Sequence, residues 1–295
     1  LRNNYIAELK RCTCCILPET FPFIEFNDKG ICNYCISYKK LQFKGEKEFI
    51  KLLNSYRSNK KEKNDCLIPF SGGRDSSYAL HYVKKELGLN PIAYSYDWGM
   101  LTNLARRNQA RMCGELGVEH ILISADIRKK RYNIRQNVSA WLKRPHLGTI
   151  PLFMAGDKQY FYYANLLMKQ NDIKLSIMGE NMLETTRFKT GFCGIRPNFK
   201  NENTYSLSTY NKFKMLSFYG KEYLLNPNYI NSSLLDTFHA FKSYYVMNHK
   251  NVNIFNYLPW IEKKVESTLI NQYDWETDPE TKSTWRIGDG TAAFY

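Results

Sequence analysis

The chain is 295 residues long, so it can bury a full hydrophobic core in one large domain or in two smaller ones. Hydrophobic residues make up 43% and charged residues 24%, which is ordinary for a soluble globular protein, and no apolar run approaches the roughly 20 residues that cross a bilayer. Its 42 basic and 28 acidic residues leave a net charge of +14. Because the basic residues are dispersed, we favour an anionic small molecule as the substrate. Nucleic acid is the less favoured alternative.

Residues 1–44 are predicted to form a small module held together by a metal. Five of the eight cysteines fall in the first 35 positions, and Cys12-x2-Cys15 is followed, after sixteen residues, by Cys32-x2-Cys35. Two such pairs supply four thiolates for a closed tetrahedral site, which is typical of structural Zn²⁺. An iron–sulfur centre and free thiols are the alternatives, and Cys14 is a fifth thiol without an assigned role. Because no secretory signal accompanies the cysteines, a reducing, cytoplasmic location is expected.

The rest of the chain is predicted to be a parallel α/β domain followed by a helical region. Residues 45–64 are expected to be a helix (46–56) and a polar linker. Short apolar strands then alternate with helices, which predicts a doubly wound parallel sheet over 65–200. The expected strands are 66–70, 91–96, 120–124 and 173–178, with helices over 76–87, 103–116 and 157–169. Residues 201–295 are expected to be mainly helical (210–219, 232–248 and 260–272), a substrate or interface region. Because the chain starts at Leu1, not Met, and stops inside an apolar stretch, we expect residues to be missing at both ends.

A glycine-rich loop joins the first predicted strand to its helix, with the sequence Ser71-Gly72-Gly73-Arg74-Asp75-Ser76-Ser77. The two glycines let the backbone turn tightly, and the N–H groups and dipole of the following helix make an anion site. The serine hydroxyls and Arg74 add donors and positive charge. Asp75 is explained if Mg²⁺ bridges its carboxylate to phosphate oxygens. The loop lacks the Walker pattern, and a helix-capping turn that happens to contain two glycines is the alternative.

Two further polar positions follow predicted strands. Asp97 ends the second strand, where a doubly wound sheet usually holds the adenosine of a nucleotide. Glu180 and Asn181 follow the strand 173–178 and are expected at the same carboxyl edge of the sheet. Glu180 is therefore a candidate ligand for a second metal or for the substrate, or else an ordinary polar residue at the start of a loop.

The motif S-G-G-x-D-S resembles the PP-loop of the N-type ATP pyrophosphatases, which cleave ATP between the α- and β-phosphates. Taken together, several segments resemble the N-acetyl sugar amidotransferase family, which includes enzymes of pseudaminic acid modification and of bacterial O-antigen assembly. These segments are the four-cysteine module, the PP-loop, Gly148–Phe153, Gly179–Asn181 and Phe188–Ile195. The similarity extends from about Arg11 to Ile195 and continues more weakly to the Trp275 region.

This resemblance implies ATP, a catalytic Mg²⁺ and a structural Zn²⁺. It also implies that the acetamido oxygen of a sugar is adenylated and then replaced by ammonia. Asp75 and Glu180 would hold the Mg²⁺. Lys189 and Arg187 would stabilise charge on the α-phosphate, unless they are solvated loop cations. The positions that the resemblance assigns to the sugar are Gly148, Thr149, Asn181, Arg187 and Thr190.

The sequence contains no glutaminase domain, so ammonia is expected either free or from a partner. The resemblance implies a separate glutaminase with a channel subunit similar to those of imidazole glycerol phosphate synthase, and we leave a homodimer open. The main alternative is a tRNA-sulfurating PP-loop enzyme. No C-x2-C follows Cys66, although Cys113 and Cys193 could act as a distant catalytic pair; otherwise Cys113 is expected in the core. A zinc-module scaffold with a degenerate loop is the non-enzymatic alternative, and the stretch Trp285–Gly290 has no assigned role.

Overall fold

The structure is a computed structural model in which residues 8–38, 42–57, 63–151, 157–181, 188–197, 207–247, 250–281 and 283–284 are described. The chain forms two compact units, each assembled from three separate stretches. Unit 1 consists of Leu1–Gln42, Ala140–Ile150 and Thr186–Asn228, and unit 2 consists of Phe43–Ser139, Pro151–Thr185 and Tyr229–Tyr295. The linear domain boundaries expected at 44, 64 and 200 stay predictions.

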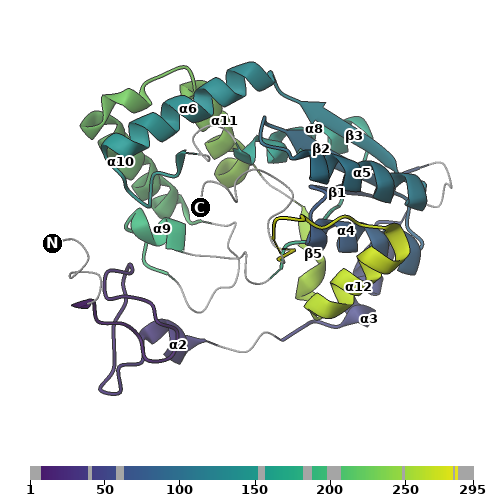
Figure 1. Cartoon of the computed structure of the whole chain (residues 1–295), viewed down its shortest axis with the longest axis horizontal. Helices are drawn as coiled ribbons and strands as arrows, with labels where there is room; N and C mark the ends of the chain where they lie inside the picture. Colours follow the sequence, from purple (N-terminus) through teal and green to yellow (C-terminus); the bar gives the residue numbers. More distant parts are fainter. Residues whose placement is uncertain are drawn as a thin grey trace. The chain divides into compact units, whose positions relative to one another are not determined.

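Unit 2 contains a five-stranded sheet with the strand order β3-β2-β1-β4-β5 (Figure 1). The strands are β1 (Cys66–Pro69), β2 (Pro91–Asp97), β3 (Glu119–Ser124), β4 (Ser176–Met178) and β5 (Asn251–Asn253). Every pair of neighbouring strands is parallel. Because β2 and β3 extend the sheet on one side of β1, and β4 and β5 on the other, the strand order reverses between β1 and β4. Ligands of open α/β sheets bind at the carboxyl ends of the strands beside such a reversal.

Helices pack against both faces of this sheet. Cys66 and Ile68 of β1 point to one face, where they join a core that includes Leu80. Leu67 points to the other face, where it packs with Leu167 and neighbouring residues. This alternation follows from the two-residue period of a strand. The helices of unit 2 are α3 (Glu46–Asn54), α4 (Arg74–His81), α5 (Asn103–Leu116), most of α6 (Ile127–Lys143), α8 (Tyr160–Gln170), α11 (Leu234–Phe241) and α12 (Glu262–Tyr273). The predicted doubly wound parallel fold is confirmed.

The element boundaries differ from the expected ones in several places. The helix expected at 76–87 begins at Arg74 and continues as a π-helical turn, Tyr82–Glu86. The strand expected at 173–178 begins only at Ser176, and the helix expected at 232–248 is α11 followed by a second π-helical turn. Strand β5 and the 17-residue helix α6 were not predicted at all. The central β-α-β order was nevertheless predicted correctly, because its apolar runs are strongly patterned.

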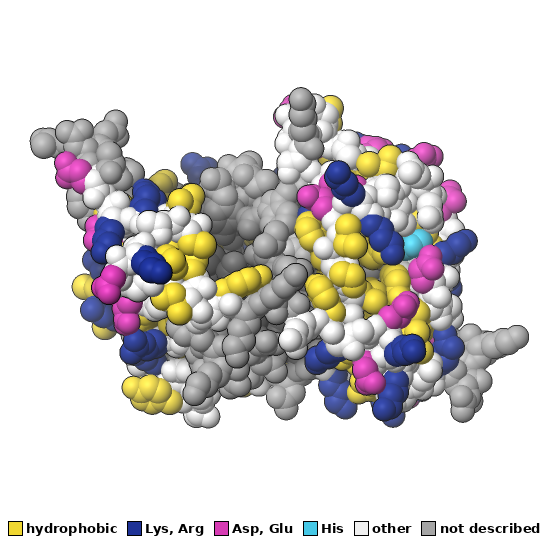
Figure 2. Space-filling view, turned by 90° about the horizontal axis from the view of Figure 1, so that it is seen from below, with side chains coloured by type: hydrophobic (Ala, Val, Ile, Leu, Met, Phe, Trp, Pro, Cys, Tyr) yellow, Lys and Arg dark blue, Asp and Glu magenta, His cyan; other side chains and the backbone are white. Residues whose placement is uncertain are grey.

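Unit 1 contains the cysteine-rich segment, α2 (Asn33–Ser37), α9 (Phe188–Phe192) and α10 (Thr209–Leu225). Phe21 of the cysteine-rich segment contacts Phe192 edge to face, with ring centroids 6.1 Å apart. A Cβ on Gly191 would lie 3.0 Å from Pro22, so the absence of a side chain there lets α9 approach this segment closely. Within the described part of the chain, the search for a helix with the length and hydropathy to cross a bilayer found none. On the face drawn in Figure 2, basic side chains are interspersed with acidic and apolar ones.

Candidate active site

The glycine-rich loop lies where the sequence placed it, between the end of β1 and the start of α4 in unit 2. Gly73 is the N-cap residue and provides no side-chain cap, so the first-turn N–H groups of α4 have no intrahelical acceptor. The Ser71 and Ser76 hydroxyls lie 3.0 Å apart, the Ser76 hydroxyl accepts from the Ser71 N–H, and the Ser71 hydroxyl accepts from the Gly73 N–H. The loop therefore presents a helix N-terminus edged by two hydroxyl groups, which suits an anion.

Gly72 is required by both the conformation and the packing of this loop. Its φ of +77° lies in the left-handed region, which favours glycine. A Cβ there would lie 2.5 Å from the carbonyl oxygen of Ala105 in the first turn of α5. The indole N–H of Trp275 donates to the Gly72 carbonyl oxygen at 3.3 Å. The loop backbone is thus held between α5 and the segment that follows α12.

Asp75 is surrounded by hydrogen-bond donors. Its Oδ2 accepts from Asn181 Nδ2 at 2.7 Å, and its Oδ1 accepts from Trp260 Nε1 at 2.8 Å and from Arg74 Nε at 3.2 Å. The Asp75 side chain is 11% exposed. A carboxylate offers about four lone-pair positions. Within the described part of the chain three of them are used, which leaves one position, on Oδ2.

The guanidinium group of Arg74 is buried against α12. Its Nη1 donates to Glu262 at 2.6 Å, to Thr284 at 2.7 Å and to Glu266 at 3.4 Å. The group also lies over the Trp260 ring, 4.8 Å from its centroid. These contacts fasten α4 to α12, and the predicted role of Arg74 in phosphate binding stays a prediction.

The remaining loop serine is enclosed. Ser77 is fully buried, and its hydroxyl has no hydrogen-bond partner among the described residues. A buried polar atom without a partner is costly, so such atoms often mark a ligand or water site. Because the Ser77 hydroxyl is inaccessible in this conformation, it can contact a phosphate only if the loop rearranges.

The two strand-end candidates make different contacts. Asp97 is buried at the end of β2, where its carboxylate accepts from the Gly99 N–H at 2.9 Å and pairs with Arg106. It thereby shapes the loop after β2. Glu180 is partly exposed after β4, and its carbonyl oxygen accepts from Asn253 Nδ2 at 2.6 Å.

The structure brings the β4 end against the loop. A Cβ on Gly179 would lie 2.5 Å from the Asp75 carbonyl oxygen, so only glycine permits this approach. Asn181 is fully buried and reaches the Asp75 carboxylate. The segment Gly179–Asn181 therefore lies at the same carboxyl edge of the sheet as the loop, as expected, and it also contacts the loop directly.

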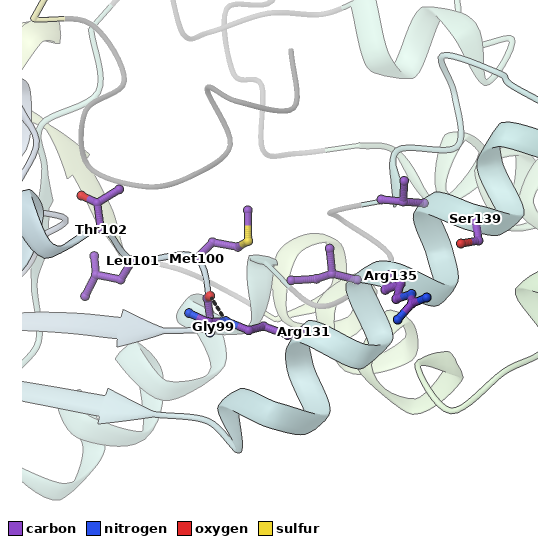
Figure 3. A pocket seen from close by; sticks show the side chains of 9 residues that line it. Gly99, Met100, Leu101, Thr102, Arg131, Arg135 and Ser139 are labelled. Atoms are coloured by element: carbon purple, nitrogen blue, oxygen red, sulfur yellow. Dashed lines mark hydrogen bonds between the residues drawn. The ribbon is translucent and has the colours of Figure 1, made fainter. Parts of the chain in front are cut away.

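A pocket of about 510 Å³ lies beside the end of β2 (Figure 3). One wall is the loop from Gly99 to Thr102, and the other is a single face of α6 that carries Arg131 and, one turn later, Arg135. Arg131 Nε donates to the Gly99 carbonyl oxygen at 2.9 Å and closes one end. The Thr102 hydroxyl accepts from the Ala105 N–H and so caps α5. The carbonyl oxygen of the same Ala105 packs against Gly72. The pocket and the glycine-rich loop therefore flank the first turn of α5.

The candidates Gly148 and Thr149 lie in unit 1 and are tightly packed. A Cβ on Gly148 would lie 2.7 Å from the ring of Phe218, and its carbonyl oxygen accepts from the Tyr219 hydroxyl at 3.1 Å. Thr149 is fully buried and donates to the His146 carbonyl oxygen. In the described geometry both residues form a packed turn.

The other family-derived candidates are only partly described. The carbonyl oxygen of Thr190 accepts from the N–H groups of Cys193 and Ile195 at the end of α9. Arg187 lies outside the described residues, as does the stretch Trp285–Gly290, and the side chain of Lys189 is likewise not described. The roles assigned to Arg187 and Lys189 stay predictions.

The four predicted metal ligands converge. The Sγ atoms of Cys12, Cys15, Cys32 and Cys35 all lie within 4.8 Å of one another. Cys12 and Cys35 approach to 3.9 Å, and Cys15 and Cys32 to 3.6 Å. Backbone N–H groups point at the Sγ atoms of Cys12 and Cys32, as expected for knuckles that stabilise thiolates. The cluster fits one tetrahedral metal ion, and four thiolates leave no position for a substrate.

The scattered cysteines are buried. Burial raises the pKa of Cys113 to about 12, and burial together with the charge of Glu222 raises the pKa of Cys193 to about 12. Burial also raises the pKa of Cys66. Burial therefore disfavours the thiolate, which is the nucleophilic form, at each of these three positions.

Comparisons with known proteins give distant likenesses. No family model matches the sequence. An uncharacterised protein of Methanocaldococcus jannaschii is 28% identical over 119 residues, which cover 39% of this chain and 43% of that protein, so the match spans less than half of the relative's length. Among solved structures, NMN synthetase from Francisella tularensis is similar with 16% identity and a TM-score of 0.33, over 79% of this chain and 88% of that one. The U34-tRNA thiolase NcsA from Methanococcus maripaludis, solved with its 4Fe–4S cluster, is similar with 14% identity and a TM-score of 0.30, over 91% and 99% of the two chains. Likenesses this distant do not bear on the activity of the chain.

The fold and site define a parallel α/β protein whose S-G-G-x-D-S loop lies at the reversal of strand order, with a separate four-cysteine centre. The contacts of Trp260 and Trp275 with the loop are not apparent from the sequence. Trp260 is 185 residues from Asp75 in the chain and Trp275 is 203 residues from Gly72, so no local pattern links them.

Proposed function

We propose that this protein is an ATP-dependent enzyme of the PP-loop type, specifically an amidotransferase that acts on the acetamido group of a sugar. The observation that carries the proposal is the uncapped start of α4 after Ser71-Gly72-Gly73, at the strand-order reversal of a parallel sheet. That site suits the pyrophosphate of ATP, since backbone N–H groups and a helix dipole attract a multiply charged leaving group. The sugar as acceptor rests on the resemblance of the sequence motifs.

In this proposal the protein acts by positioning and by charge stabilisation. The first-turn N–H groups of α4 and the Ser71 and Ser76 hydroxyls hold the β- and γ-phosphates. Asp75 has one lone-pair position left, so Mg²⁺ would be held mostly by phosphate oxygens and water, which suits its reluctance to dehydrate. When bound, Mg²⁺ supplies charge neutralisation at the phosphates. Asn181, Trp260 and Arg74 keep the Asp75 carboxylate pointed at the loop.

The acetamido oxygen attacks the α-phosphorus of ATP, which forms an adenylated imidate and expels pyrophosphate. Ammonia then adds to the imidate carbon, and AMP departs with the former amide oxygen. The overall reaction converts the amide, ATP and ammonia into the amidine, AMP and pyrophosphate. We propose a separate glutaminase, with a channel subunit, as the ammonia source.

The burial of Cys113 and Cys193 supports amidation over tRNA thiolation. A thiolase needs a cysteine that carries or activates sulfur, and the pKa values of Cys113 and Cys193 are both raised to about 12. The four-cysteine cluster is suited to a structural metal, because all four thiolates converge on one point. These observations disfavour both the Cys113 and Cys193 pair and the four-cysteine cluster as sources of reactive sulfur.

The test is an assay of AMP formation with ATP, Mg²⁺, ammonium and a panel of acetamido sugars, with unmodified tRNA as a parallel acceptor. A sugar labelled with ¹⁸O in its acetamido carbonyl is expected to transfer the label to AMP and to yield a product with NH in place of oxygen. AMP formed only with tRNA contradicts the proposal, as does AMP that stays unlabelled while the amidine accumulates. Cys193→Ala separates the two chemistries further, because amidation does not use this thiol and is expected to continue.

A further inference from the structure

We propose that Trp260 and Trp275 are positioning residues for the glycine-rich loop, each setting a different property of it. Trp260 orients the carboxylate of Asp75, and Trp275 orients the loop backbone at Gly72. This inference rests on the proposed function, because the property set by Trp260 is expressed in turnover.

Trp260 contacts the loop through both its N–H and its ring. The indole N–H donates to Asp75 Oδ1 at 2.8 Å, and the guanidinium of Arg74 lies 4.8 Å from the ring centroid. Asn181 holds the other carboxylate oxygen at 2.7 Å. The carboxylate is therefore fixed from two sides, by Trp260 just before α12 and by Asn181 just after β4. A hydrogen bond to a charged group is among the stronger polar contacts in proteins.

Trp275 acts from the segment that follows α12, residues 274–281, which we call the C-terminal strap. Trp275 is 2% exposed, and its indole N–H donates to the Gly72 carbonyl oxygen at 3.3 Å. The next residue, Glu276, anchors the strap to α5 through Arg107 and Arg111, at 2.7 and 2.8 Å. The strap lies beside α4 and α5 in Figure 1, where it is drawn in yellow.

A second anchor strengthens the strap. The N–H of Glu276 donates to Asn108 Oδ1 at 2.8 Å, and Asn108 Nδ2 donates back to the Glu276 carbonyl oxygen at 2.9 Å. This reciprocal pair, made by a fully buried asparagine, fixes the strap backbone next to Trp275. The indole is thus presented to Gly72 by a rigid support, which is what precise positioning requires.

The geometry of the peptide bond explains why holding Gly72 matters. The Gly72 carbonyl and the Gly73 N–H belong to one planar peptide unit, so fixing the oxygen fixes the direction of that N–H. The Gly73 N–H donates to Ser71 Oγ at 3.2 Å, and Ser71 is exposed. Through this peptide unit Trp275 acts on the position of the Ser71 hydroxyl, one of the groups that would meet the phosphates.

The experiment compares Trp260→Phe and Trp275→Phe with Trp141→Phe. Each variant removes one indole N–H and keeps an aromatic ring. In the control, the lost N–H donates to the His146 carbonyl oxygen in unit 1 at 3.0 Å. The dissociation constant of MgATP is measured by titration calorimetry on the full chain, and kcat for AMP formation is measured with the amidation assay. Active-site titration corrects kcat for any inactive fraction.

We expect Trp260→Phe to lower kcat about 10- to 100-fold while MgATP affinity changes less than about threefold. We expect Trp275→Phe to weaken MgATP binding about 3- to 10-fold, and Trp141→Phe to leave that affinity unchanged. Equal losses of kcat in Trp260→Phe and Trp275→Phe, with MgATP affinity intact in both, would indicate a merely structural role and overturn the inference. Unchanged kcat and affinity would overturn it as well.

The two proposals fail separately. If the wild-type protein binds MgATP but forms no AMP with any acceptor, the proposed amidation is refuted. Trp275 is then still tested by the binding titration, in which an affinity equal to that of the control refutes its role. If the wild-type protein does not bind MgATP at all, both proposals fall.

Discussion

Replacing Asp75 by asparagine tests whether its carboxylate is needed for catalysis or only for the structure of the site. The three bonds to Asp75 come from Asn181, Trp260 and Arg74. In Asp75→Asn the new amide oxygen can face Trp260 and Arg74, while the new NH₂ group faces Asn181, whose own amide can rotate to present its oxygen. All three bonds then survive without their charge. At roughly 0.5–1 kcal/mol lost for each bond, the fold loses about 2 kcal/mol, or about 4–8 °C in Tm.

Asp75→Ala is the matched comparison, because it leaves the three donors without any acceptor. The expected loss is about 3–5 kcal/mol, or roughly 6–20 °C in Tm. Both variants are expected to lower kcat for AMP formation by about 100-fold or more, since neither retains a negative charge at the loop. Calorimetric melting and the AMP assay check these values. An Asp75→Ala variant that melts like the wild type would show that the bonds are not made, and full activity in Asp75→Asn would refute the catalytic role.

Four further changes have defined outcomes. Gly72→Ala is expected to cost about 1–3 kcal/mol in a denaturant titration, because its φ is +77° and its Cβ would lie 2.5 Å from the Ala105 carbonyl oxygen; unchanged stability contradicts this packing. Cys15→Ser is expected to remove about one equivalent of bound zinc per chain by elemental analysis, since three thiolates remain, and full retention of metal argues against the site. Burial lowers the pKa of His81, although Glu86 partly opposes this, so below its ordinary value of 6.5 the unfolded chain binds more protons than the folded chain. Tm is therefore expected to fall as the pH is lowered from 7.5 to 5.5, and His81→Gln is expected to reduce this decrease. An unchanged pH dependence of Tm in the variant would show that His81 is not its source. The thiol of Cys193 is expected to resist alkylation at pH 8 until the protein is denatured, because its pKa is raised to about 12, and rapid labelling of the native protein would contradict its burial.

The parts of the site that could be predicted are those coded locally. The glycine-rich loop was identified because strand, glycines and helix start follow one another within a few residues. The four metal ligands were identified because each cysteine pair has a fixed spacing, and the structure brings all four together. In both cases the residues that define the feature are close in sequence, so a local pattern is enough to identify them.

The parts that could not be predicted depend on partners far away in the chain. The direction of the Arg74 side chain is decided by Glu262, 188 residues later. Strand β5 has only three residues, two of them asparagine, and is recognisable only by its pairing with β4. Helix α6 was missed because its apolar pattern is diluted by basic residues. Tertiary context overrides local propensity in each of these cases.

The alternation of the two units along the chain has a consequence for synthesis. Six stretches alternate between unit 1 and unit 2, and the last of them, Tyr229–Tyr295, supplies β5, α12 and the C-terminal strap. A chain that ends before this stretch still has the glycine-rich loop but lacks the two indoles that hold it. Neither unit can be obtained by cutting the chain once. A nascent or prematurely terminated chain therefore does not have a complete loop site, and the site is completed only when the final stretch joins unit 2.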